Sequence, residues 1–338
     1  MLKRLEWFAK NALAIVLAVL LWRPGRRTRA RRALGSGLRG RVLLVRPDNR
    51  VGEALLLTPV LDALAAQGFA VHALVHAKVR RVLEGHPRVT KLWSDGPRLP
   101  LLRALRAERF EVVIDCGNWA VSSVTAAVLA RLAGPHAVVL GPSHLPAGWL
   151  MDVAVAPRSD TRNEGLQRAH LASALVGELE RASLSFRATP ASTQAPAAPY
   201  AVINPGGRLG YRRVDPTLFA VAARVALERG VTPLVTWGPG EEALADEVCA
   251  LEPRAMRAPP TSLDQLASLM RGATFAVCNN TGPMHLSVAC GCRTLALFLH
   301  MDVERWGHPS APHVMLDLTP VPEAGRATAV ESAVRAFG

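Results

Sequence analysis

Aromatic residues and long apolar runs are both scarce in this chain. Only 5% of the 338 residues are aromatic, although half of all residues are hydrophobic. The apolar run ALAIVLAVLLW at 12–22 has eleven residues, whereas about 20 are needed to cross a bilayer core. This composition excludes a disordered tail and predicts a globular chain large enough for about two domains.

Cysteine is also rare, and its odd count argues against a disulfide framework. Most of the five cysteines lie inside apolar runs, which suggests buried, reduced thiols. Cys290-Gly-Cys292 lacks the second pair and the histidine spacing of a zinc site. The five are Cys116, Cys249, Cys278, Cys290 and Cys292.

Two common motifs for phosphate and metal binding are absent. No Walker A sequence occurs, so any phosphate site must be built in another way. No Asp-x-Asp pair occurs either, although many metal-dependent sugar transferases use one, and Asp302-Val-Glu304 is the nearest approach to it. We therefore expect no metal site.

Negative charge is almost missing from the first forty residues. They hold ten basic residues and one acid, and so carry +9 of the formal net charge of +13. A signal peptide is disfavoured because no small-x-small cleavage site follows the apolar run and the polybasic RPGRRTRARR does. Binding to nucleic acid is disfavoured because no aromatic residues are interleaved with the basic ones.

The segment 1–40 is therefore predicted to be a basic amphipathic helix at a membrane surface. A short apolar stretch with a polybasic flank suits the anionic cytoplasmic face of an inner membrane, to which the protein would attach peripherally. The alternative is an N-terminal helix that packs on its own domain.

Beyond residue 41 the chain alternates β-type and helical runs, which predicts α/β architecture with parallel sheets. Strands are predicted at 42–46, 70–75, 112–115 and 137–140, and again at 200–203, 231–236, 275–278 and 294–298. The Pro/Ala/Ser/Thr-rich stretch 188–199 reads as a linker. We expect one domain at 41–187 and another at 200–338, with ligand in the cleft between them at the carboxyl ends of the strands.

Polar residues follow several of these strands. RPDNRVGEALLLTP at 46–59 places Glu53 at a turn into a helix, where a carboxylate either caps the helix or takes a proton. NPGGRLGYRR at 204–213 combines two glycines with three arginines, which either neutralise phosphate or are simply solvated.

Two further turns have the same form. TWGPGEEALADE at 236–247 opens a helix with Glu241 and Glu242, which either bind ribose hydroxyls or cap the helix. CNNTGPMHLSVACG at 278–291 provides a helix N-terminus with free amides, which is a common anion site.

Taken together, these stretches resemble glycosyltransferase family 9, the ADP-heptose:lipopolysaccharide heptosyltransferases. VGEALLLTPVLDAL is similar to that family's GD-x-(L/V)-x-TP motif, and the 204–219 stretch to its HPG-x-x-x-x-x-(K/R)-x-W motif. The 278–307 stretch resembles GNDSGPMHLAAA followed by RWG. The similarity runs in the same order from about residue 41 to about residue 310.

The resemblance implies a GT-B fold, with two Rossmann-like domains facing a central cleft. It also implies an inverting, metal-independent transfer of heptose from ADP-heptose to a lipid-linked, phosphorylated lipopolysaccharide inner-core acceptor, with no cofactor beyond the nucleotide sugar. Glu53 stands at the position of the catalytic base. Asn118 and Trp119 are candidates for acceptor binding. The implied donor-binding residues are Arg208, Arg212, Arg213, Glu241, Glu242, Asn280, Thr281, Gly282, Pro283, Met284 and His285.

Several residues depart from the family pattern. Glu53 replaces an aspartate, Asn280 replaces the aspartate of NDSGP, and Leu299-His300 replace Gly-Pro. The last two changes lie around the expected donor pocket. Two alternatives therefore stay open: a glycosyltransferase with another nucleotide-sugar donor, and a non-catalytic nucleotide- or glycan-binding relative at the membrane.

Overall fold

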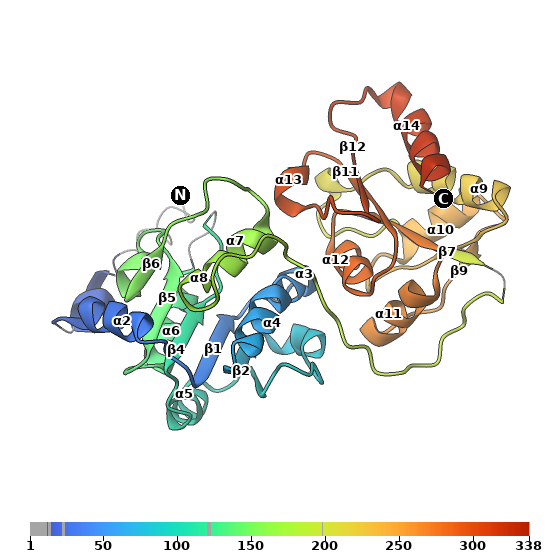
Figure 1. Ribbon diagram of the computed structural model, residues 1–338. Coiled ribbons are helices and arrows are strands. Elements are labelled where there is room, and N and C mark those ends of the chain that lie inside the picture. The colour runs from blue at the N-terminus through green and yellow to red at the C-terminus, as the bar shows by residue number, and fades with distance from the viewer. Residues whose placement is uncertain (1–11, 13–14, 22–23, 120–122, 198, 338) are drawn as a thin grey trace. The chain divides into compact units, whose positions relative to one another are not determined.

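The computed structural model describes residues 12, 15–21, 24–119, 123–197 and 199–337. The chain divides into two compact units, Met1–Ser183 (unit 1) and Leu184–Gly338 (unit 2). Each unit contains a six-stranded sheet in which every pair of neighbouring strands is parallel. In Figure 1, unit 1 runs from blue to green and unit 2 from yellow to red.

The sheet of unit 1 has the strand order β3-β2-β1-β4-β5-β6. Its inner strands are almost wholly buried, which explains why they read as short apolar runs in the sequence. The first strand, β1, pairs with both β2 and β4, and Val45 lies opposite Asp115 in the second pairing. The strands are β1 (Arg41–Arg46), β2 (Ala70–Val75), β3 (Lys91–Ser94), β4 (Val112–Asp115), β5 (Val138–Pro142) and β6 (Val153–Val155).

Helical segments lie between consecutive strands of this sheet, as in a Rossmann-type unit. One core cluster joins Leu43 and Val45 of β1 and Val113 of β4 to the alanines of α6. The helical segments are α2 (Arg26–Gly35), α3 (Val51–Leu55), α4 (Thr58–Ala66), η1 (Ala77–Val82), α5 (Arg98–Ala107), α6 (Val124–Ala133), η2 (Ala147–Leu150), α7 (Glu164–His170) and α8 (Ser173–Val176).

Unit 2 repeats this topology, with the strand order β12-β11-β10-β7-β8-β9. Its first strand, β7, pairs with β8 and β10, and Asn204 lies opposite Cys278. The strands are β7 (Tyr200–Asn204), β8 (Thr232–Val235), β9 (Met256–Arg257), β10 (Phe275–Asn279), β11 (Thr294–Phe298) and β12 (Val314–Asp317).

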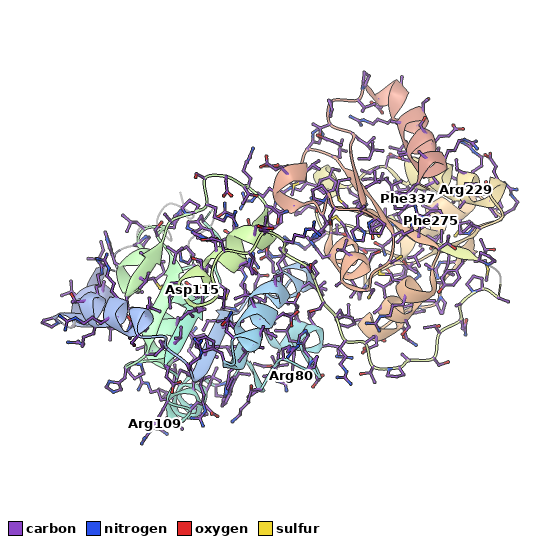
Figure 2. The ribbon with its side chains drawn as sticks, in the orientation of Figure 1. Arg80, Arg109, Asp115, Arg229, Phe275 and Phe337 are labelled. Carbon is purple, nitrogen blue, oxygen red and sulfur yellow. The ribbon has the colours of Figure 1, made fainter. Side chains whose placement is uncertain are left out.

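The core of unit 2 closes against its last helix. Phe275 meets Phe337 edge-on, with ring centroids 6.0 Å apart, and the Arg229 guanidinium lies over the Phe275 ring (Figure 2). The helical segments are η3 (Gly210–Arg212), α9 (Pro216–Glu228), α10 (Glu242–Leu251), α11 (Leu263–Gly272), α12 (Gly282–Ala289), α13 (Val303–Trp306) and α14 (Glu323–Ala336).

In both units the chain starts in a central strand, adds strands on one side and then crosses to the other. The crossing point lies between β1 and β4 in unit 1 and between β7 and β10 in unit 2. Ligands of open α/β sheets bind at the carboxyl ends of the strands at such a point. The predicted α/β fold with two Rossmann-like domains is confirmed.

The stretch predicted as a linker, 188–199, has no helix or strand among its described residues. It runs along α11: the Thr189 amide donates to Asp264 Oδ1 at 2.7 Å, and Gln265 Nε2 donates to the Ser192 carbonyl at 3.1 Å. These contacts attach it to unit 2.

The described part of the basic N-terminal segment has two different faces. Leu17, Ala18 and Leu21 pack against the core cluster of unit 1, whereas Val19 and Leu20 are 70% and 72% exposed. Residues 1–11, 13–14 and 22–23 of this prediction lie outside the described residues. Within the described residues, no helix combines the length and the apolar character needed to cross a membrane.

Candidate functional site

The carboxyl end of β1 in unit 1 carries a buried cluster of charges around Glu53. Arg46, the last residue of β1, donates from Nη2 to Glu53 Oε2 at 2.7 Å. Arg168 of α7 donates to the same oxygen and also to the Glu53 carbonyl. Arg50 Nη2 lies 3.3 Å from Glu53 Oε1. Both carboxylate oxygens therefore face guanidinium groups.

The ion pairs around Glu53 are buried, and they therefore decide the ionisation state of its carboxylate. Glu53 is 4% exposed and Arg168 is 0% exposed. Burial alone would raise the pKa of Glu53, but Arg168, Arg46 and Arg50 together hold it well below its ordinary value of 4.5. Arg168 also pairs with Glu164, and its own pKa is raised by the two carboxylates despite its burial. Glu53 is therefore ionised, and its affinity for a proton is low.

A second carboxylate, Asp115, lies at the same crossing point. It is the last residue of β4, is 2% exposed, and is labelled within unit 1 in Figure 2. The Gly117 amide donates to Asp115 Oδ1 at 3.0 Å. Burial raises the pKa of Asp115 to about 6, while the Gly117 hydrogen bond and the Arg46 charge act in the opposite direction.

The two candidate acceptor residues follow β4 directly. Asn118 is buried, and Trp119 is half-buried and donates from its indole nitrogen to the Val155 carbonyl at 2.9 Å. That bond ties the loop after β4 to the end of β6. The prediction that these two side chains bind acceptor stays untested.

In unit 2 the three predicted turn motifs meet at one edge of the sheet. Asn279, which ends β10, donates to the carbonyls of Pro205 and Gly206 and accepts from the Val214 amide at 3.0 Å. Asn204, which ends β7, donates to Thr236 after β8. Buried side-chain amides therefore connect the carboxyl ends of the three central strands.

Glu241 braces the two glycine-containing turns. Its Oε1 accepts from the Gly207 amide at 2.8 Å, and its Oε2 accepts from the Gly238 amide at 3.2 Å. A Cβ on Gly206 would lie only 2.1 Å from Glu241 Oε2, so a larger residue there would force the Glu241 carboxylate to move. Glu242 begins α10 and accepts from the Gly240 amide at 3.4 Å. In this state Glu241 stabilises loops, and binding of ribose by either glutamate remains a prediction.

Three arginines lie beside this edge without acidic partners. In the described residues, the side chains of Arg208, Arg212 and Arg213 make no hydrogen bond or ion pair, and the Arg212 guanidinium lies over the Tyr211 ring. A Cβ on Gly207 would lie 3.4 Å from Thr281 Cγ2 and 3.6 Å from Arg213 Cγ. Arg213 and the start of α12 are thus adjacent.

The N-terminus of α12 retains unused donors. Thr281 makes no side-chain cap, and the amides of Thr281 and Gly282 reach no acceptor in the described residues. Pro283 has no amide proton, and the Met284 amide already donates to the Thr281 carbonyl at 3.1 Å. Of the four residues Thr281 to Met284, two therefore have amides available for an anion.

The remaining donor-side candidates differ in their environments. Asn280 Nδ2 is buried without a hydrogen-bond partner in the part of the chain that the structure describes. His285 is buried, and its Nδ1 lies 2.8 Å from His308 Nε2. Burial and the nearby His285 and His313 hold the pKa of His308 well below its usual range. His285 thus packs in a histidine pair one turn into α12.

Two further features concern glycine-rich and metal-binding motifs. The glycine spacing G-x-G-x-x-G occurs in GSGLRG at 35–40, but it precedes β1 and so does not form a strand-to-helix turn. Within the described residues, no group of three or more His, Cys, Asp or Glu side chains is placed to hold a metal ion.

Sequence reasoning did not single out Arg46, Arg50, Glu164, Arg168 or Asp115. Arg168 lies 115 residues from Glu53 in the chain, and nothing local marks α7 as part of the site. Asp115 had a detectable signal, because it ends an apolar strand that was predicted.

Comparison with known proteins agrees with this architecture. The family model described as glycosyltransferase family 9 (heptosyltransferase) matches residues 98–331. The structure of E. coli heptosyltransferase WaaC with ADP is similar with a TM-score of 0.71 and 18% identity, covering 88% of this chain and 100% of that one. No curated protein sequence matches the chain.

Two other solved structures show the same fold. A family 9 glycosyl transferase from Veillonella parvula has a TM-score of 0.69 and 18% identity, covering 85% of this chain and 88% of that one. E. coli ADP-heptose lps heptosyltransferase II has a TM-score of 0.68 and 16% identity, covering 88% and 99%.

Two Rossmann-type units of this topology match the fold of the solved heptosyltransferases. The family model covers more than half of the chain, and the chain therefore belongs to glycosyltransferase family 9, the heptosyltransferase family. The family resemblance predicted from the sequence motifs is confirmed.

Proposed function

We propose that this glycosyltransferase moves heptose from ADP-heptose to a lipid-linked, phosphorylated lipopolysaccharide inner-core acceptor, by a single inverting displacement that needs no metal. The observation that carries the proposal is the edge of the unit 2 sheet, where three arginines without acidic partners adjoin two free amides of α12. Family membership and the relatives solved with ADP and with ADP-2-deoxy-2-fluoro heptose support a nucleotide-sugar donor there.

In this proposal unit 2 binds the donor and unit 1 binds the acceptor. Arg212 and Arg213, with Arg208 beside them, neutralise the diphosphate as it leaves, and the Thr281 and Gly282 amides donate to its oxygens. These positive groups replace the metal ion that other transferases use for the same charge. Unit 1 supplies the carboxylate that removes the acceptor proton, for which Glu53 was the sequence-based candidate.

The N-terminal segment fits a lipid-linked acceptor. Its exposed apolar face, with Val19 and Leu20, precedes the exposed arginines of α2, and such a combination binds an anionic membrane surface. We propose peripheral attachment at the cytoplasmic face of the inner membrane, next to the acceptor.

A second candidate keeps the reaction and changes the donor. The buried Nδ2 of Asn280 has no partner in the described residues and stands where the family has an aspartate. The neutral Asn280 amide can donate a hydrogen bond from this atom. It therefore favours a sugar that presents a hydrogen-bond acceptor or an anionic group at that position.

The test compares sugar transfer and nucleotide binding in one set of proteins. Transfer from ADP-heptose and from other ADP-sugars to a Kdo-lipid A type acceptor is measured alongside ADP affinity by calorimetry. Arg212→Ala and Arg213→Ala each remove a charge-assisted contact worth about 1.5–3 kcal/mol, so ADP affinity should fall roughly 10- to 150-fold. Arg224→Ala, which removes an exposed arginine on α9, is the matched control and should bind ADP as the parent does.

The outcomes separate the hypotheses. Heptose transfer by the parent supports the proposal, and transfer from another ADP-sugar alone supports the second candidate. ADP binding without any transfer would identify a non-catalytic relative. Unchanged ADP affinity in both arginine variants would contradict the proposed phosphate site.

A further inference from the structure

The loop between β5 and β6, residues 143–152, presents apolar side chains to solvent from a closely packed backbone. Leu145 is 56% exposed and Trp149 is 39% exposed. A Cβ on Gly148 would lie 2.8 Å from the Ser143 carbonyl oxygen, so the backbone of the loop folds tightly on itself. Unit 1 therefore leaves two large apolar side chains in water at a loop whose backbone has little freedom to bury them.

The loop and the N-terminal segment pack on the same core. Ala147 and Leu150 of the loop are buried members of one hydrophobic cluster of unit 1. Leu17 and Leu21 of the N-terminal segment pack against that cluster. The exposed apolar side chains of the loop and those of the N-terminal segment therefore belong to elements that share one core.

A buried ion cluster also joins the loop to α2. Asp152, at the end of the loop, pairs with Arg26 of α2 and with Arg131 of α6, the latter at 2.7 Å. Arg131 Nε donates to the Leu150 carbonyl at 3.0 Å. Arg26 Nη1 donates to the Leu21 carbonyl at 3.1 Å. Because water is largely excluded from these pairs, their attraction is weakly screened, and they hold the loop, α2 and the segment before it as one surface element.

The loop leaves the sheet at the edge that carries the acceptor-side charges. β1, β4 and β5 are parallel neighbours, so their carboxyl ends lie at one edge of the sheet. Glu53 follows β1 at this edge, Asp115 ends β4, and the loop begins after Pro142, the last residue of β5. A membrane contact made by the loop therefore brings the acceptor-side edge of unit 1 toward a lipid-linked substrate.

The charge of this surface favours an anionic lipid as its partner. Between Glu6 and Asp48 the sequence has no acidic residue. Four exposed arginines of α2 make no ion pair within the residues that the structure describes. They are Arg27, Arg29, Arg31 and Arg32. Apolar side chains, a tryptophan and unpaired arginines are the features by which interfacial segments bind an anionic bilayer.

We propose that residues 143–152 are a second membrane-contact element, which forms one lipid-binding surface with the N-terminal segment and α2. The inference rests on the peripheral attachment proposed above and adds to it a contact outside the first forty residues. The Trp149 indole lies at the level of the lipid headgroups, Leu145 enters the acyl boundary, and the α2 arginines bind lipid phosphates. A single helix leaves unit 1 free to rotate about the helix axis, whereas two separate contacts fix its orientation on the bilayer.

The experiment measures sedimentation with vesicles of phosphatidylethanolamine and phosphatidylglycerol. Leu145→Glu together with Trp149→Glu should bind at least tenfold more weakly than the parent, because two carboxylates oppose both apolar insertion and the lipid charge. Leu251→Glu together with Met256→Glu makes the same change at residues of unit 2 that are 51% and 45% exposed, and should bind as the parent does. Binding of the parent should weaken on vesicles of phosphatidylcholine alone and at high salt.

A second measurement reports on the tryptophan itself. Bromine-labelled acyl chains quench the fluorescence of tryptophans that touch them. Trp149→Phe keeps an apolar ring, so it should retain vesicle binding while losing part of the quenching that the parent shows. Thermal unfolding of each variant separates a lost contact from misfolding.

Three results overturn the inference. Unchanged vesicle binding by the loop double variant, or unchanged quenching in Trp149→Phe, shows that the loop does not contact lipid. Self-association of the parent in solution that disappears in the loop double variant shows that a second copy of the chain covers this surface. A parent that binds no vesicles overturns the proposed attachment, and the inference with it, whereas a parent that binds vesicles through the loop but transfers no sugar overturns only the proposed activity.

Discussion

Glu53 shares its buried site with residues that are equally hidden from water. Arg46, Glu164 and Arg168 are all nearly or fully buried, and every one of them pairs with a member of the same cluster. Moving such charges out of water is costly, and only their mutual pairing offsets that cost. The contribution of Glu53 to stability is therefore measured most directly by removing its charge while keeping its shape.

Glu53→Gln should lower the free energy of unfolding by about 3–5 kcal/mol, since it leaves buried guanidinium groups without a counter-charge. Glu53→Asp, which keeps the charge, should cost less. Urea denaturation at pH 7 measures both. A Glu53→Gln protein as stable as the parent would show that the cluster contributes no net pairing energy.

The ion pairs of Glu53 should also make the free energy of unfolding depend on pH. The arginines depress the pKa of Glu53 below its ordinary value of 4.5, so its stabilising contribution is fully present above pH 4.5. That contribution is lost progressively as the pH falls from 4.5 toward the folded-state pKa, because the unfolded chain binds the proton first. Denaturation of the parent between pH 5 and pH 3 should show this loss, and Glu53→Gln should lack it.

At the scale of elements, the donor-side turns depend on hydrogen bonds between segments that are distant in the sequence. Asn279 joins β10 to the turn after β7, and Glu241 joins that turn to the one after β8. Each bond satisfies buried backbone groups that no helix or strand pairs. The shape of the proposed diphosphate site is therefore a property of three turns together.

Gly206→Ala should disturb the hydrogen bonds by which Glu241 connects these two turns. The new Cβ would collide with Glu241 Oε2, so the carboxylate must withdraw from the Gly207 and Gly238 amides. The loss of these two hydrogen bonds should cost about 1–2 kcal/mol, and ADP binding should weaken roughly tenfold. Calorimetry with ADP checks this, and Gly210→Ala is the matched control because its added Cβ meets Arg213 Nη2 only at 3.6 Å. Equal effects of the two variants would contradict the role given to Glu241.

At the scale of the whole molecule, the exposed apolar face of the N-terminal segment and the arginines that follow it belong to one surface element of unit 1. Arg26 differs from the other arginines of α2, because it pairs with the buried Asp152 and attaches the helix to the sheet. The segment is thus anchored on one side and exposes apolar side chains on the other, which suits contact with a lipid surface.

Val19→Glu together with Leu20→Glu should reduce sedimentation with vesicles that contain anionic lipid by at least tenfold, because two carboxylates oppose both apolar insertion and the lipid charge. Leu251→Glu introduces the same change at a 51% exposed leucine of unit 2 and should bind vesicles as the parent does. Transfer to a soluble, short-chain acceptor should survive in both proteins. Undiminished vesicle binding by the double variant would place the membrane contact elsewhere.

The inner strands of both sheets could be predicted from the sequence, but the four outer strands could not. β1, β2, β4 and β5, and their counterparts β7, β8, β10 and β11, are buried apolar runs with a recognisable pattern. The strands that were missed, β3, β6, β9 and β12, are the edges of the two sheets, and each is short and partly exposed. An edge strand needs no apolar run, because only one side of it is paired and its faces are partly solvated.

The sequence by itself determined the α/β class, the two-unit organisation, the family and the turns that carry the donor-side residues, because these depend on local periodicity and on motifs in a fixed order. Only the tertiary structure decided the electrostatic state of the two carboxylates. Arg168 reaches Glu53 from 115 residues away and suppresses its basicity, whereas burial between β1 and β5 raises that of Asp115. The affinity of a carboxylate for a proton depends on the charges and the water around it, and folding brings those neighbours together from distant parts of the chain.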